Sequence, residues 1–127
     1  MRKKSYPADA HGLGVEGRAP LNEIFTPMEK SRLCGREFRC VELNRVDFSR
    51  ADLRHSEFLD VSLRAADFSG ADLRGASFIR CDLREACFDS AILDGARFDA
   101  SWVVGATGLS AAERDRIRSS GGFIWYF

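Results

Sequence analysis

The sequence has 127 residues, which is enough for one domain with a hydrophobic core of its own. Its 19 basic and 19 acidic residues give a formal net charge of zero, so no global field favours nucleic acid or an anionic membrane. The basic start MRKK is followed by no apolar run of secretory length, and no later stretch approaches the ~20 apolar residues of a membrane span. We therefore expect a soluble, cytoplasmic protein.

The N-terminal flank comprises residues 1–30. Residues 1–19 are rich in glycine, polar and charged residues, which predicts a partly mobile segment. Residues 20–25 (PLNEIF) are more apolar, and we expect them to lie against the start of the domain that follows.

Residues 31–107 carry an unbroken five-residue repeat. A large apolar residue stands at every fifth position from Leu33 to Val103, and in nearly every unit a small residue precedes it by two positions. A five-residue period marks no face of a helix, whereas positions two apart in an extended segment point the same way. Each unit is therefore predicted to direct one large and one small side chain inward, while its other three residues point outward and turn a corner.

The alternation of Leu and Phe along this array predicts the length of one turn. A three-sided turn of fifteen residues would stack Phe over Leu, whereas a four-sided turn of twenty residues stacks like over like. The four-sided turn predicts two opposite ladders, one of Phe38, Phe58, Phe78 and Phe98 and one of Phe48, Phe68 and Phe88. Successive turns would lie about 4.8 Å apart, the distance between hydrogen-bonded strands.

The segments ADLRH, ADFSG, ADLRG and CDLRE within the array resemble the A(D/N)LXX unit of the pentapeptide-repeat family. The resemblance covers residues 31–107. It implies an all-β solenoid, a right-handed quadrilateral β-helix of about four coils. Arg36 takes an inward position, and Ile92, Arg97 and Trp102 replace the usual acid or small polar residue. We therefore expect the first and last coils to be less regular than the middle.

Four cysteines form two C-x5-C pairs, namely Cys34, Cys40, Cys81 and Cys87. Structural zinc sites usually space their cysteines more closely, and the twenty-residue register places these four in different columns, so we expect no metal site. Cys81 is predicted to lie in the core and Cys87 to point outward. The acids that precede the central Leu or Phe occupy their ordinary position in the resembled family and are interpreted as a solvated surface. The sequence therefore predicts neither catalysis nor a cofactor.

Residues 108–127 are predicted to form a C-terminal capping helix and an apolar tail. Ser110 and Glu113 have the spacing of a capping box, which predicts a short helix to about Arg118 that is stopped by Gly121 and Gly122. The tail FIWYF must be covered, either by folding back on the last coil or by meeting a second copy. We expect Phe123 and Ile124 to cap the coil, and Trp125, Tyr126 and Phe127 to reach a partner.

Two outward features depart from the solvated pattern. Leu59 and Ile79 are twenty residues apart and both follow a Phe, so they are expected to stack on one outer face between Arg39 and Asp99. Trp102 and Val104 are expected on the neighbouring side of the last turn. Either a flank folds over these residues, or they form a partner surface.

The sequence favours a non-catalytic protein-binding or scaffold module that engages another protein or a second copy of itself. Nucleic acid and membranes are not expected partners. The family resemblance also implies an alternative, a DNA mimic that inhibits or protects a topoisomerase such as gyrase. That role requires a strongly acidic rod, whereas Ser31 to Leu109 hold 13 acids against 11 bases, a net charge of −2. A purely structural domain is the remaining alternative.

Overall fold

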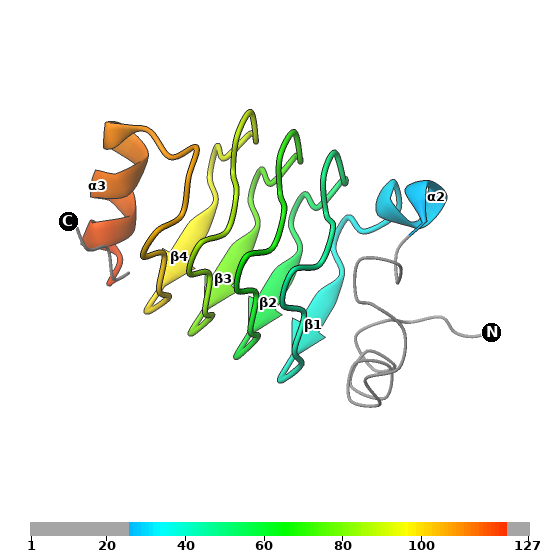
Figure 1. Cartoon of the computed structure of the whole chain (residues 1–127), viewed down its shortest axis with the longest axis horizontal. Coiled ribbons are helices and arrows are strands. Elements are labelled where there is room, and N and C mark those ends of the chain that lie inside the picture. Colours follow the sequence, from blue (N-terminus) through cyan, green and yellow to red (C-terminus); the bar gives the residue numbers. More distant parts are fainter. Residues whose placement is uncertain (1–25, 122–127) are drawn as a thin grey trace.

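A computed structural model describes residues 26–121 of the chain. These residues form a coil with one helix at each end (Figure 1). Four short strands, β1 (Glu37–Arg39), β2 (Glu57–Leu59), β3 (Ser77–Ile79) and β4 (Arg97–Asp99), lie side by side in one parallel sheet in that order. Helix α2 (Pro27–Lys30) precedes the strands and helix α3 (Ala111–Ser119) follows them.

Every pairing between turns joins residues that are twenty apart in the sequence. In the sheet, Phe38 is paired with Phe58, Phe58 with Phe78, and Phe78 with Phe98. Isolated parallel bridges mark the other three sides of the coil, represented by Glu42 with Ser62, Asp47 with Asp67, and Asp52 with Asp72. The predicted twenty-residue turn, in which like residues stack over like, is thus confirmed.

The core consists of the predicted inward side chains. Every large residue from Leu33 to Val103 is buried, and most of the small residues that precede them are buried as well. The ring centroids of Phe38, Phe58, Phe78 and Phe98 stack at 4.8, 4.7 and 5.0 Å. Those of Phe48, Phe68 and Phe88 stack at 5.5 and 5.2 Å. The two ladders also meet edge to face across the interior, so each central ring packs in both directions.

The corners of the coil depend on one backbone position in each unit. Every fifth residue from Gly35 to Gly105 has a positive φ, whether or not it is glycine. On three sides the corner closes as a β-turn, for example through Ala51 N–H donating to Phe48 O at 3.0 Å. Next to β3 and β4, buried side chains also bond to the corner backbone: Ser101 Oγ accepts from Cys81 N–H and donates to Phe78 O, both at 3.0 Å.

Helix α2 begins with a capping box in which Thr26 and Glu29 bond to each other's backbone N–H groups. This helix was not predicted within the flank of residues 1–30, although Thr26-Pro27-x-Glu29 is a recognisable start signal. The helix is joined to the coil because Lys30 O accepts from Asp52 N–H at 2.9 Å and Lys30 Nζ lies 3.1 Å from Asp47. It therefore lies against the first turn of the coil.

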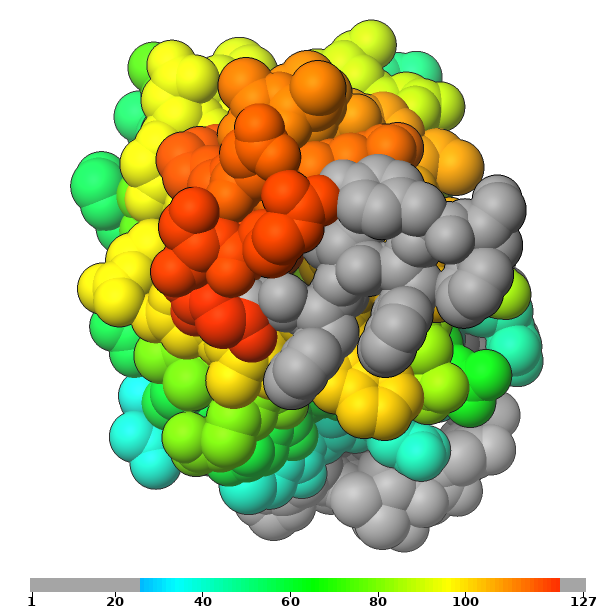
Figure 2. All heavy atoms as spheres, turned by 90° about the vertical axis from the view of Figure 1, so that its left-hand side faces the viewer, coloured from blue at the N-terminus to red at the C-terminus, as the bar shows by residue number. Residues whose placement is uncertain are grey.

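Helix α3 confirms the predicted C-terminal cap. Ser110 is its N-cap in a capping box with Glu113, and the helix runs to Ser119, one residue beyond the expected Arg118. Ile117 is buried against the last turn, and Arg116 Nη1 donates to Ala96 O at 2.8 Å. In Figure 2, which looks onto this end, α3 lies against the coil with residues of the last turn visible beside it. The helix thus supplies a donor to a strand-edge carbonyl.

The expectation of an irregular last coil is wrong, whereas in the first coil no bridge joins Arg32 to Asp52 and the buried Nη1 of Arg36 has no hydrogen-bond partner. Arg97 lies within β4 and is paired with Ser77, and Trp102 is paired with Asp82. At the other end, Glu37–Arg39 is an ordinary strand of the sheet, and Arg36 is half-buried in the inward position predicted for it. The substitutions are tolerated because residues 92, 97 and 102 point outward, where the register does not depend on side-chain size.

Within residues 26–121, neither helix has the length and apolar character needed to cross a membrane.

Candidate protein-binding surface

The outer side of the four-stranded parallel sheet is called the strand face. The central Phe of each strand points inward, so the two residues beside it point outward. One outward column contains Glu37, Glu57, Ser77 and Arg97. The other contains Arg39, Leu59, Ile79 and Asp99. The corner residues Cys40, Asp60, Arg80 and Ala100 border the second column.

Leu59 and Ile79 lie in the middle of the strand face. They are direct register partners on β2 and β3, with Arg39 and Asp99 beyond them, as the sequence predicted. Both side chains are half-buried. The strand face therefore has an apolar centre between charged ends.

Ion pairs surround this apolar centre. Arg39 Nε lies 3.0 Å from Glu37 Oε2 on β1, and Arg97 Nη2 lies 2.7 Å from Asp99 Oδ2 on β4. At the border, Arg80 donates to both carboxylate oxygens of Asp60 at 2.8 and 3.0 Å, which lowers the pKa of Asp60. The order of the charges is reversed between β1, where the acid comes first, and β4, where the base comes first.

Trp102 and Val104 lie on the neighbouring side of the coil. Trp102 has 45% of its surface exposed, and the guanidinium carbon of Arg84 lies 4.9 Å from the centroid of its ring. This contact is a cation–π interaction. Val104 is half-buried. A shallow hollow of about 350 Å³ lies beside the indole, lined by Arg80, Cys81, Asp82, Arg84, Ala100 and Trp102. The hollow connects Trp102 to the Arg80 border of the strand face.

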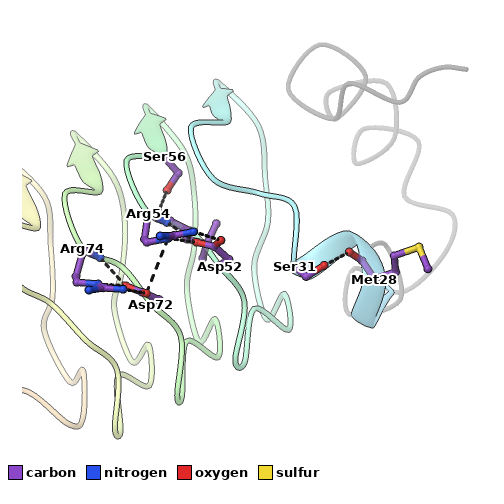
Figure 3. Close-up of polar contacts among 8 residues, drawn as sticks. Met28, Ser31, Asp52, Arg54, Ser56, Asp72 and Arg74 are labelled. Atoms are coloured by element: carbon purple, nitrogen blue, oxygen red, sulfur yellow. Dashed lines mark hydrogen bonds and ion pairs between the residues drawn. The ribbon is translucent and has the colours of Figure 1, made fainter.

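A different side of the coil, which we call the Asp–Arg side, carries Asp52, Arg54, Asp72 and Arg74 (Figure 3). Each arginine bonds to the aspartate two residues before it, through Nε and Nη2 at 2.6 to 2.8 Å. A longer contact of 4.0 Å joins Arg54 to Asp72 of the next turn. These bonds lower the pKa of Asp52 and Asp72. The acids are thus charged but paired, which does not favour their use as general acids or bases near neutral pH.

Ile92 lies at the end of the Asp–Arg side, where it is paired with Asp72. It has 44% of its surface exposed, about as much as Trp102. Ile92 departs from the repeat pattern in the sequence, but it was not among the predicted surface residues. Ile92 follows Asp72 by twenty residues, so it lies in the same outward column as Asp52 and Asp72.

The cysteines are free thiols in separate places. Cys81 is buried, and burial raises its pKa to about 11, whereas Cys34 and Cys40 are exposed and Cys87 is half-buried. Across the described ranges, no three His, Cys, Asp or Glu side chains come together in a way that would hold a metal ion.

The C-terminal end has a second hollow, of about 230 Å³, between α3 and the last turn. It is lined by Gly95, Ala96, Arg97, Phe98, Arg116, Ile117 and Ser120. The tail residues predicted to cap the coil or reach a partner, Phe123, Ile124, Trp125, Tyr126 and Phe127, lie outside the described residues. Their role stays a prediction.

The geometry defines a repeat protein of the solenoid class, in which each turn pairs only with its neighbours. The family model of pentapeptide repeats matches residues 38–70 and 62–99, with eight copies of the repeat. The chain belongs to the pentapeptide-repeat family, whose solved members are β-helix proteins. No curated protein matches the sequence.

Two solved structures illustrate the likeness. A pentapeptide repeat protein from the thylakoid lumen of Arabidopsis thaliana is 31% identical, with a TM-score of 0.59 over 70% of this chain and 65% of that protein. A pentapeptide repeat protein from the cyanobacterium Cyanothece is 23% identical, with a TM-score of 0.55 over 64% of this chain and 55% of that protein. The chain therefore spans less than two thirds of either protein.

QnrB1, a plasmid-mediated fluoroquinolone resistance protein, also matches, over 73% of this chain and 64% of its own. Its sequence identity is 15% and its TM-score is 0.34. A likeness at this level gives no support for a shared partner.

Proposed function

We propose that this protein is a non-catalytic binding module of the pentapeptide-repeat family, and that the strand face is its binding surface. In this proposal residues 31–107 form a right-handed quadrilateral β-helix of about four coils, and residues 108–127 cap it. The single observation that carries the proposal is the stacking of Leu59 and Ile79 at the centre of the outer side of the sheet. The protein is proposed to act in the cytoplasm.

The proposal has two physical grounds, a rigid core and an apolar pair on the surface that this core supports. The Phe ladders leave the backbone little freedom, so outward side chains are held at fixed spacings from turn to turn. An apolar pair held on a surface and bordered by charged residues has the composition of a protein-binding surface. Binding to a preorganised surface of this kind loses little conformational entropy.

Two isoleucines provide a matched test. Ile79→Ser removes the apolar centre of the strand face, whereas Ile92→Ser makes the same chemical change on the Asp–Arg side. In affinity capture from an extract of the source cells, we expect Ile79→Ser to lose the specific partners and Ile92→Ser to retain them. Equal capture by the two variants, both confirmed as folded by circular dichroism, would contradict the proposal.

The topoisomerase-directed DNA mimic is less well supported. The repeat region has a net charge of only −2, and arginines pair with six of its acids, Glu37, Asp52, Asp60, Asp72, Asp82 and Asp99. A DNA mimic must reproduce the charge density of a duplex, about one negative charge per 1.7 Å of axis. A gyrase supercoiling assay at low salt tests this alternative, and we expect no inhibition at micromolar protein concentrations.

A further inference from the structure

We infer that the partner of the strand face is a second copy of this chain, docked face to face about a two-fold axis that runs parallel to the strands. The inference rests on the proposed binding role of the strand face and specifies its partner. It is drawn from the arrangement of charges over the four strands.

The outward residues of the strand face form a grid. Its four rows are the strands β1 to β4, and its two columns are the residues before and after the central Phe of each strand. A two-fold axis parallel to the strands, placed between β2 and β3, reverses the order of the rows and keeps the columns. It therefore places β1 of one copy over β4 of the other, and β2 over β3, with the strands of the two sheets aligned. Aligned packing is one of the two ordinary arrangements for stacked sheets.

Under this operation, opposite charges meet at every charged position of the strand face except Glu57. Glu37 lies over Arg97 of the second copy, and Arg39 lies over Asp99 of the second copy. At the border, Asp60 lies over Arg80 of the second copy.

The remaining positions of the strand face also match. Leu59 lies over Ile79 of the second copy, so the apolar centres coincide. Glu57 lies over Ser77 of the second copy, which is a neutral hydrogen-bonding side chain. No described pair on the strand face brings two like charges together.

The ion pairs within one copy do not compete with this arrangement. Glu37 and Arg39 form one pair and Arg97 and Asp99 form another with the opposite order of charges. When the two pairs face each other, every charge has two opposite neighbours in an alternating group of four. The side chains are available for this purpose, since the side chains of Arg39, Arg80 and Arg97 are 64%, 61% and 68% exposed.

The other in-plane axis fits the strand face poorly. A two-fold axis along the coil would keep the rows and exchange the columns, so Leu59 would lie over Glu57 of the second copy and Ile79 over Ser77. A charged carboxylate would then lose water against an apolar side chain, which is unfavourable. The axis parallel to the strands is therefore the one that the residues support.

The Asp–Arg side fails the same symmetry test. A two-fold axis parallel to the bridged segments of this side would place Asp52 over Asp72 of a second copy and Arg54 over Arg74 of that copy. Both contacts bring like charges together, so this side of the coil disfavours its own copy in the arrangement inferred for the strand face. The complementarity of the strand face is thus not a general result of the five-residue repeat.

The size of the strand face sets the expected affinity of self-association. Four strands at about 4.8 Å and three residues at about 3.3 Å give a footprint on the order of 19 by 10 Å. This footprint is smaller than the interface of a stable dimer, which buries roughly 800 Å² on each partner. We therefore expect reversible association in the micromolar-to-millimolar range that weakens as salt is added.

Sedimentation velocity of the full chain over a concentration series tests the inference through a charge swap. Glu37→Arg alone and Arg97→Glu alone each replace two symmetric attractive contacts with repulsive ones. We expect either change to weaken self-association on the order of tenfold or to make it undetectable. The double variant restores the attractive contacts between copies but leaves like charges side by side within each copy, so it is expected to associate more tightly than either single variant without reaching the wild type. Arg64→Glu, an exposed change of the same net charge away from the strand face, is the control and is expected to dimerise normally.

The outcomes separate this inference from the proposed function. A monomer at every concentration overturns the inference, while a partner that depends on Ile79 would still support the binding role. A dimer that is insensitive to both single variants but lost in a chain ending at Gly122 also overturns it, because the interface would then lie at the tail. Single variants that fail to dimerise without rescue in the folded double variant likewise overturn it. Thermal unfolding of each variant shows whether a change in association reflects a change in folding.

Discussion

The strand face and the Asp–Arg side enclose one core, and they differ in the identity and the order of their outward residues. On the strand face, Leu59 and Ile79 occupy the middle and ion pairs of opposite order occupy the ends. On the Asp–Arg side, two ion pairs of the same order occupy the middle and Ile92 lies at the end. In a coil whose interior is nearly uniform, the information about binding therefore lies in the outward positions.

The largest expected effect concerns the core that both surfaces share. Phe68 stacks between Phe48 and Phe88 and meets Phe58 and Phe78 edge to face, so Phe68→Ala removes contacts in both directions. We expect a loss of about 3–5 kcal/mol in the free energy of unfolding. Phe38→Ala, at the start of the array, is expected to lose less. Urea midpoints compare the two, and an equal or smaller loss at Phe68 would contradict the account of the ladders.

The next effect concerns the small inward positions. Ala71 is fully buried beneath the Asp–Arg side, and its N–H donates to Phe68 O at 3.0 Å. Ala71→Leu is expected to cost about 1–3 kcal/mol because the interior has no room for the added carbons. Urea unfolding measures the change, and wild-type stability in this variant would show that the interior accommodates them.

A smaller effect is expected from acid on the Asp–Arg side. Bonds from Arg54 and Arg74 lower the pKa of Asp52 and Asp72 below their ordinary value of 3.8. The unfolded chain therefore takes up these protons at a higher pH than the folded chain. The pairs stabilise the fold above the unfolded pKa, and this contribution is lost as the pH falls through the folded pKa.

We accordingly expect the urea midpoint to fall as the pH drops below about 4. Asp72→Asn removes one of the titrating carboxylates and is expected to reduce this fall. An unchanged pH profile in Asp72→Asn would mean that the pairs contribute nothing measurable, as is common for exposed ion pairs.

The smallest expected effect on stability separates binding from folding. Ile79→Ser and Ile92→Ser change outward side chains, so both are expected to unfold within about 0.5 kcal/mol of the wild type. Only Ile79→Ser is expected to weaken self-association. A large stability loss in Ile79→Ser alone would show that this side chain serves the core, which would remove the reason for calling the strand face a binding surface.

The sequence was sufficient to predict the buried architecture. The fifteen large residues from Leu33 to Val103 repeat without a gap, and burial of such residues overrides local differences between units. The capping helix was predicted from Ser110 and Glu113 because a capping box is a local signal.

Other features depend on information that is not local. A positive φ recurs at every fifth residue, but glycine occupies only five of these positions between Gly35 and Gly105, so composition gave little indication of it. The stacking of Leu59 on Ile79 and the order of charges on β1 and β4 follow from the register, whereas the ion pairs that these charges form within each strand are side-chain contacts that the structure adds. The identity of a partner depends on such surface order rather than on the repeat.

The most direct test of the central claim is a concentration series of amide proton–nitrogen correlation spectra of the full chain. Association through the strand face predicts that concentration-dependent shifts are confined to β1–β4 and their Asp60 and Arg80 border, and that added salt reverses them. The amides of Asp52, Arg54, Asp72 and Arg74 are predicted to stay unchanged. Shifts centred on the Asp–Arg side or on α3, or spectra that do not change with concentration, would contradict the claim that the strand face is the self-binding surface.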